Sequence, residues 1–291
     1  MAKENQRLWW QECSAAEIIE RAKDCDIALL PLGSIEQHGY HLPTGEDSWH
    51  SIKILEKVAK RTGAIILPPP WYGAHPYWQM GQPANLPLRF ETWLNLYTDI
   101  IHGAAASDYN KFIILNCHGQ EWAVPSLVQK LGGEGYFVLA PTLWDIRKEK
   151  WAEVLDTYFL HAGEAETSLG LYLVPHLVDM DKAKDKLNMG KGLLEDKWYI
   201  WPLVGKFEEP GSVPSHEQLK ERVPMHYTFT GAPPEREVWP PNTLHVWGYA
   251  TKATAEKGKK IVNFIVDWLV DLIEEIITKY PPGVNPLKKQ K

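Results

Sequence analysis

The chain has few of the features that mark secreted, membrane or nucleic-acid-binding proteins. Its 291 residues include only three cysteines, which is too few for a disulfide framework and favours a reducing cytoplasm. The net charge of −6 argues against a nucleic-acid partner, and the short basic run at 288–291 is typical of a solvated chain end. Acidic residues interrupt the longest apolar stretch, and the N-terminus lacks the pattern of a signal peptide, so we expect no membrane span and no secretion.

The composition is otherwise that of an ordinary globular protein. With 44% hydrophobic and 23% charged residues, the chain can bury a full core. Fourteen tryptophans and 22 prolines stand out. Most of these tryptophans are expected in the core or in contacts between subunits, and two or three are expected to wall a substrate pocket.

Strand and helix patterns alternate along the chain. Short apolar runs predict buried strands, and periodic apolar positions predict helices between them. The strands are expected at 27–32, 64–67, 111–116 and 136–140. The helices are expected from the capping box at Ser14, then at 51–61, 91–106, 124–131 and 251–277. This alternation implies right-handed crossovers and a mainly parallel sheet in a three-layer α/β/α fold, with ligands bound beyond the carboxyl ends of the strands.

One stretch breaks this alternation. From about 182 to 241 the chain is rich in proline and tryptophan and has no regular pattern. A loop of this length is functional or disordered, and its aromatic residues argue against disorder. We therefore expect one domain over 1–291 with an insert at about 182–241 that serves as a lid or a subunit-contacting arm.

The most informative segment is 33–47, GSIEQHGYHLPTGED, directly after the first strand. Glu36 and His38 are two residues apart, so on extended backbone their side chains point to the same side. Gly39 and Gly45 would let the loop fold back and bring Asp47 to that side as well. Nitrogen and oxygen ligands at a strand end suit Zn, Mn or Fe, and the segment therefore predicts a metal site.

Two further motifs strengthen the metal hypothesis. The strand 111–116 delivers Cys117-His118-Gly119-Gln120 at its end, and HAGEAETS at 161–168 precedes an apolar helical run. Together with the first segment, these motifs resemble those of the creatininase (creatinine amidohydrolase) family, which carries PLGSxEQHGxHLPxGxD, NGHGxN and HAGExETS in this order. The resemblance covers roughly 26–175.

The resemblance implies a binuclear centre with two divalent metal ions per subunit. Glu36 and His118 would hold one ion, His38 and a further carboxylate the other, and Asp47 would bridge them. His161 is the candidate for the acid that protonates the leaving group. Where creatininase proper has a metal-binding Glu, this chain has Gln120, which carries no charge. The fifth ligand is therefore expected to be Glu164, with Glu166 and Glu121 as alternatives.

Other residues receive roles outside the ligand set. His75, Trp78 and Trp122 are the candidates for substrate contact. His41 is expected to hold a neighbouring ligand, and Cys117 is expected to be a small buried side chain. The resemblance also implies a homo-oligomer, commonly a hexamer.

The implied reaction is hydrolysis of a small polar compound, expected to be cyclic, at an amide C–N bond by a metal-bridging hydroxide. A first alternative is hydrolysis of a C–C bond that opens a cyclic diketo-inositol of the 3-dehydro-scyllo-inosose type. An alternative of another class is an inactive oligomeric ligand-binding protein, because Cys117 and Gln120 depart from the motifs.

Overall fold

A parallel sheet forms the centre of the computed structural model, which describes residues 6–76, 79–157, 159, 161–185, 246 and 248–288. Its four strands lie in the order β2-β1-β3-β4. Their bounds are Ile65–Ile66 for β2, Ile27–Leu32 for β1, Lys111–Asn116 for β3 and Phe137–Leu139 for β4. All three pairings are parallel, which confirms the predicted sheet.

The two central strands are buried along their whole length. They pair in register from Ile27↔Lys111 to Leu32↔Asn116. Since successive side chains of a strand point to opposite faces, Leu29 enters one hydrophobic cluster and its neighbour Leu30 enters the other. The apolar runs that predicted these strands are therefore explained by helices on both faces.

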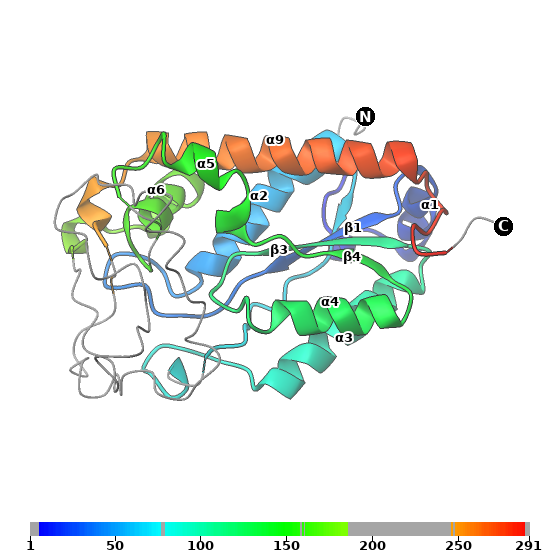
Figure 1. Cartoon of the computed structure of the whole chain (residues 1–291), viewed down its shortest axis with the longest axis horizontal. Helices are drawn as coiled ribbons and strands as arrows, with labels where there is room; N and C mark the ends of the chain where they lie inside the picture. The colour runs from blue at the N-terminus through cyan, green and yellow to red at the C-terminus, as the bar shows by residue number, and fades with distance from the viewer. Residues whose placement is uncertain are drawn as a thin grey trace.

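Helices cover the sheet in two layers (Figure 1). One layer packs on the cluster with Leu30 and contains α1 (Ala15–Asp24), α3 (Phe90–Ala105) and α4 (Val124–Gly133). The other layer packs on the cluster with Leu29 and contains α2 (Glu46–Thr62), α5 (Lys148–Trp151), α6 (Glu164–Leu173) and α9 (Ala255–Lys279). Short 3-10 turns lie at Trp10–Glu12, Leu143–Asp145, Pro175–Leu177, Met180–Lys182 and Ala250–Lys252.

The predicted elements all occur, but two helix starts differ. Helix α2 begins at Glu46, not at 51. The apolar pattern missed its first turn, because the buried residues of that turn are polar. Helix α9 begins at Ala255, not at 251, because Thr254 caps it by accepting a hydrogen bond from the Lys257 amide. The capping box at Ser14 is present as predicted.

Two expectations concern parts of the chain that the structure does not fully describe. The insert at about 182–241 lies outside the described residues from 186 onward. Among the helices that are described, none is both long and apolar enough to cross a membrane.

Helices α6 and α9 approach each other closely at Gly258. A Cβ atom at this position would stand 1.9 Å from the carbonyl oxygen of Ser168, so only glycine fits without a shift of backbone. This contact fixes how far α9 can approach α6, whose first turn contributes to the candidate site.

Gly258→Ala should therefore destabilise the protein by about 1–3 kcal/mol or more, as overpacking does. The matched control is Gly103→Ala, because Gly103 is an exposed glycine in α3 with nothing within 4 Å of the added Cβ. The control should be neutral or stabilising by up to about 1 kcal/mol, as expected from helix propensity. Urea unfolding of both variants checks this, and equal stability of the two would contradict the packing argument.

Candidate metal centre

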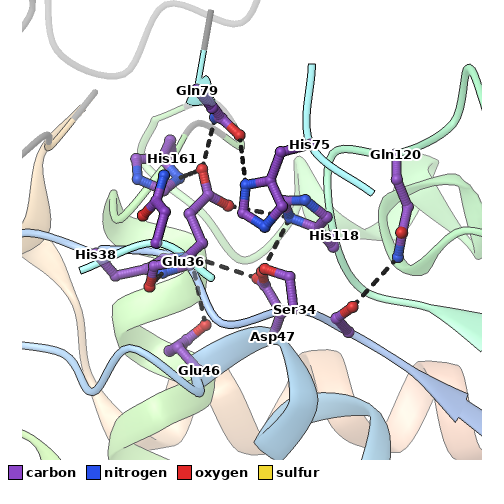
Figure 2. A network of polar contacts seen from close by, with 12 residues as sticks. Ser34, Glu36, His38, Glu46, Asp47, His75, Gln79, His118, Gln120 and His161 are labelled. Atoms are coloured by element: carbon purple, nitrogen blue, oxygen red, sulfur yellow. Dashed lines mark hydrogen bonds and ion pairs between the residues drawn. The ribbon is translucent and has the colours of Figure 1, made fainter. Parts of the chain in front are cut away.

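Acidic and histidine side chains gather at the carboxyl ends of β1 and β3, where helices α2 and α6 also begin (Figure 2). The described residues contain three groups whose ligand atoms lie within 4.8 Å of one another. These groups are Glu36, Asp47 and His118; His38, Glu46 and Glu166; and Glu36, His38 and His161. Of the predicted metal ligands, the structure thus brings Glu36, His38, Asp47 and His118 together.

Asp47 lies between the first two groups. Its Oδ2 atom is 3.0 Å from Nδ1 of His118, and its Oδ1 atom is 3.3 Å from Nε2 of His38. The hydroxyl of Ser34 donates a hydrogen bond of 2.8 Å to Oδ2. One carboxylate therefore faces a histidine on each side, with a different oxygen for each, as a bridging ligand requires.

Several buried nitrogen atoms of the cluster have no hydrogen-bond partner. Nδ1 of His38 lies 3.1 Å from the backbone carbonyl of Glu36, which can only accept, so this nitrogen carries the proton. In the neutral ring Nε2 then presents a lone pair, and this atom makes no hydrogen bond. Nε2 of His118 is also buried without a hydrogen bond, and its Nδ1 faces only carboxylate oxygens, those of Glu36 and Asp47 at 3.0 Å. Buried polar atoms without partners are rare, and here they fit ligands of divalent metal ions.

The loop between β1 and α2 lets the start of the helix lie close to the end of the strand. A Cβ atom at Gly33 would lie 2.4 Å from the backbone nitrogen of Ser48, so α2 starts directly against the end of β1. The amide of Glu36 donates to the carbonyl of Thr44 at 2.9 Å and closes the loop. Gly39 has φ +66°, which favours glycine.

Gln120 and His118 are positioned by the end of β3. The side chain of Asn116 donates to the carbonyl of His118 at 2.9 Å and fixes its backbone. Gln120 donates to Asn116 and accepts a 2.9 Å hydrogen bond from the amide of Ala74. It therefore links two loops and does not replace a carboxylate ligand. Cys117 is buried, as expected.

The fifth ligand requires a correction. The structure directs Glu164 away from the cluster, where its carboxylate accepts hydrogen bonds from Lys257 of α9 and from the amides of Asp156 and Thr157. Glu166 enters the cluster instead, with Oε2 at 3.6 Å from Nε2 of His38. Two residues along a helix rotate a side chain by about 200°, so the two glutamates face opposite ways. Glu121, the other alternative, belongs to none of the three groups.

His161 belongs to the third of these groups. Its ring packs on that of His38 with centroids 4.4 Å apart, and its Nε2 donates to the carbonyl of Gln37 at 2.8 Å. Nδ1 is therefore unprotonated in the neutral ring and lies 3.9 Å from a carboxylate oxygen of Glu36. Burial lowers the pKa of His161 to about 4, an effect that the nearby Glu36 only partly opposes, so the ring is neutral near pH 7.

His75 also lies at the cluster, with its ring centroid 4.5 Å from that of His118. Gln79 holds it in place by accepting from Nδ1 at 3.0 Å while donating to Glu36 at 2.6 Å. Sequence reasoning missed Gln79, because nothing in its local pattern signals this role.

Of the other two predicted substrate contacts, the structure describes only Trp122. Trp122 makes its ring contact with Phe90 of α3, on the face covered by α3 and α4. Trp78 lies outside the described residues. His41 bonds Thr167 at 2.9 Å, next to Glu166, which agrees with its expected supporting role.

The carboxylates of the cluster are crowded in the absence of cations. Burial raises the pKa of Glu166 well above its usual range, and Glu46 and Asp47 add to this. Burial would lower the pKa of His118, but Glu36 and Asp47 outweigh it and raise the pKa to about 10. Binding of divalent ions at this cluster would therefore be coupled to the release of protons.

Fold and site together define an α/β protein with a candidate metal centre at the carboxyl edge of its sheet. Residues 11–273 match the family described as creatininase, creatinine amidohydrolase. The chain therefore belongs to the creatininase family, and the expected family, fold class and hydrolase activity are confirmed.

Curated relatives include two hydrolases. The 3-dehydro-scyllo-inosose hydrolase of Thermotoga maritima is 30% identical over 287 residues, which cover 96% of this chain and 86% of that protein. The creatinine amidohydrolase of Pseudomonas putida is 27% identical over 296 residues, which cover 94% of this chain and 96% of that protein.

Solved structures with the same fold include creatininases. A structure described as creatininase Mn superposes with a TM-score of 0.68 at 24% identity, over 95% of this chain and 100% of that chain. A creatinine amidohydrolase structure has a TM-score of 0.69 at 23% identity, over 96% of this chain and 100% of that chain. At this identity the likeness establishes the fold alone.

Proposed function

We propose that this hydrolase works with two divalent metal ions that share Asp47. Glu36 and His118 would complete the first site, and His38 and Glu166 would complete the second. The observation that carries the proposal is the position of Asp47 between two buried histidines, each of which faces a different oxygen of its carboxylate, at 3.3 and 3.0 Å. When bound, two such ions lower the pKa of a shared water and polarise a carbonyl group. The donor set suits Zn, Mn or Fe.

His161 is suited to move a proton during hydrolysis. Its neutral ring presents the unprotonated Nδ1 on the side of Glu36. This atom can accept a proton from the attacking water and return it to the leaving group. The hydrogen bond to the carbonyl of Gln37 would hold the ring in orientation throughout.

His75 is proposed to contact the substrate. Because Gln79 accepts from Nδ1, the Nε2 atom of His75 is an acceptor in the neutral ring, and it is buried without a partner. An atom of this kind suits a substrate hydroxyl group. Gln79 would also fix the carboxylate of Glu36, to which it donates.

For the reaction, we favour C–C bond hydrolysis of a cyclic polyol diketone over cleavage of a cyclic amide. The relative that hydrolyses 3-dehydro-scyllo-inosose matches 96% of this chain at 30% identity. In such a reaction water adds to one ketone and the adjacent C–C bond breaks. The electron pair remains on the neighbouring carbon as an enolate of the second ketone, and a proton completes the product. Amide cleavage stays the second candidate because of the creatinine amidohydrolase relative.

The remaining proposals concern the localisation, assembly and domain organisation of the protein. We retain a cytoplasmic homo-oligomer, with a hexamer suggested by the family resemblance, and one domain over 1–291. An inactive binding protein is disfavoured because four of the five motif residues predicted to bind metal converge.

A substrate panel tests the proposed reaction. The purified protein, loaded with Mn or Zn, should open a cyclic polyol diketone with a kcat/KM well above that for creatinine and for cyclic amides, as followed by chromatography of the acid product. Removal of the metal with a chelator should abolish the activity, and Mn should restore it. A preference for a cyclic amide would reverse our order of candidates.

The corrected fifth ligand is tested by two matched substitutions. Glu166→Gln should remove about one metal ion per chain, because it takes an anionic ligand from one site. Glu164→Gln should keep both ions and lower thermal stability, because it breaks the buried contact with Lys257. Elemental analysis after dialysis measures the ions. Loss of metal in the Glu164 variant alone would contradict the correction.

His161→Ala should lower kcat about 10²–10⁴-fold, as expected for loss of a general acid–base group, with metal content unchanged. Steady-state kinetics and elemental analysis of the same preparation provide the two readouts. A fall in metal content would make His161 a ligand and remove it from the proposed proton transfer.

A further inference from the structure

Glu46 is a fully buried carboxylate that the proposed mechanism does not use. It lies in the first turn of α2, directly before Asp47, and its side chain is 0% exposed. Its Oε2 atom makes no hydrogen bond, and its Oε1 atom has only the ring of His50 as a close partner. A buried carboxylate in this state is costly unless a cation compensates it.

The surroundings of Glu46 point toward the cluster. Its Oε2 atom lies 4.0 Å from Nε2 of His38, the atom that also faces Asp47 and Glu166. Figure 2 shows the Glu46 side chain directed at His38 from below. On its other side, Oε1 lies 2.6 Å from Nε2 of His50, one turn further along α2. The two carboxylate oxygens of Glu46 thus face two different histidines, His38 and His50.

Helix α6 leaves room for this carboxylate. Gly170 has no side chain, and a Cβ atom there would stand 3.4 Å from Oε1 of Glu46, near the lower limit of ordinary contact. The same added atom would lie closer still to Leu42 and Val178, at 3.1 and 3.2 Å, so this face of α6 is closely packed.

We propose that Glu46 is an additional ligand of the metal ion held by His38 and Glu166, and that His50 orients it. This inference rests on the proposed two-ion function. Two ligand atoms at about 2.1 Å from one ion are at most about 4.2 Å apart. The separations of His38 from Asp47, Glu166 and Glu46 are 3.3, 3.6 and 4.0 Å, and all meet this limit.

Charge balance supports the same assignment. The first two groups contain four carboxylates, which are Glu36, Glu46, Asp47 and Glu166. Four negative charges match the four positive charges of two divalent ions. Without a bound cation nearby, Glu46 would have only histidines as partners within a crowd of carboxylates.

The competing explanation is a structural ion pair between Glu46 and a protonated His50. It accounts for Oε1 but leaves Oε2, which faces His38, without a role. The two explanations predict different effects of substituting Glu46. Loss of a structural ion pair lowers the stability of the fold, whereas loss of a ligand lowers the affinity of one metal site.

Titration with Mn²⁺, followed by calorimetry and by elemental analysis after dialysis, separates them. The wild-type protein should bind two ions per chain. Glu46→Gln should keep one ion at near wild-type affinity and weaken the other by more than the 10–100-fold typical of a residue that only orients a ligand. His50→Gln should weaken the same ion within that range.

The matched control is Glu56→Gln, the same substitution on the same helix, where the carboxylate pairs with Lys53 at the surface. It should leave both affinities unchanged. If Glu46→Gln does not fold, Glu46→Asp, which withdraws the carboxylate by one methylene group, should show the same selective loss.

Two outcomes would overturn the inference, and they are distinguishable. A folded Glu46 variant that binds two ions with wild-type affinity but melts at a lower temperature would establish a structural ion pair and leave the two-ion function standing. A wild-type protein that binds no ions would end both proposals.

Discussion

The site depends on the close approach of the first turn of α2 to the end of β1. Gly33 permits this approach, since any side chain there would collide with the backbone of Ser48. As a result Asp47 enters the space between His38 and His118, and Ser34 fixes one of its oxygens. A substitution at Gly33 would separate the two halves of the cluster without touching a candidate ligand.

The electrostatics of the fold favour carboxylates at this place. Helices α2 and α6 both begin at the cluster, and each carries two acidic residues in its first turn. The positive end of a helix dipole stabilises a negative charge there. The parallel sheet brings β1 and β3 to the same edge, so their loops add His38 and His118. Burial then removes water, which leaves cations as the natural partners of the crowded carboxylates.

Much of this arrangement could be predicted from the sequence. The bounds of β1 and β3 were predictable because both faces of each strand are buried and the apolar runs are unbroken. The start of α2 was not, because Glu46 and Asp47 look like loop residues when a helix is judged by its apolar positions. The motif favoured Glu164 over Glu166, because the contact that draws Glu164 away comes from Lys257 of α9, which is 93 residues away in sequence. Glu46 and Gln79 gave no sequence signal, because only the folded loops bring them to the cluster.

Crystals grown with Mn²⁺ and measured near the manganese absorption edge test the central claim most directly. The account predicts two anomalous peaks per chain, roughly 3.5–4 Å apart, one on each side of the Asp47 carboxylate. The first peak should lie at Glu36 and His118, and the second at His38 and Glu166. A single peak, or peaks remote from Asp47, would contradict the shared carboxylate on which the account is built.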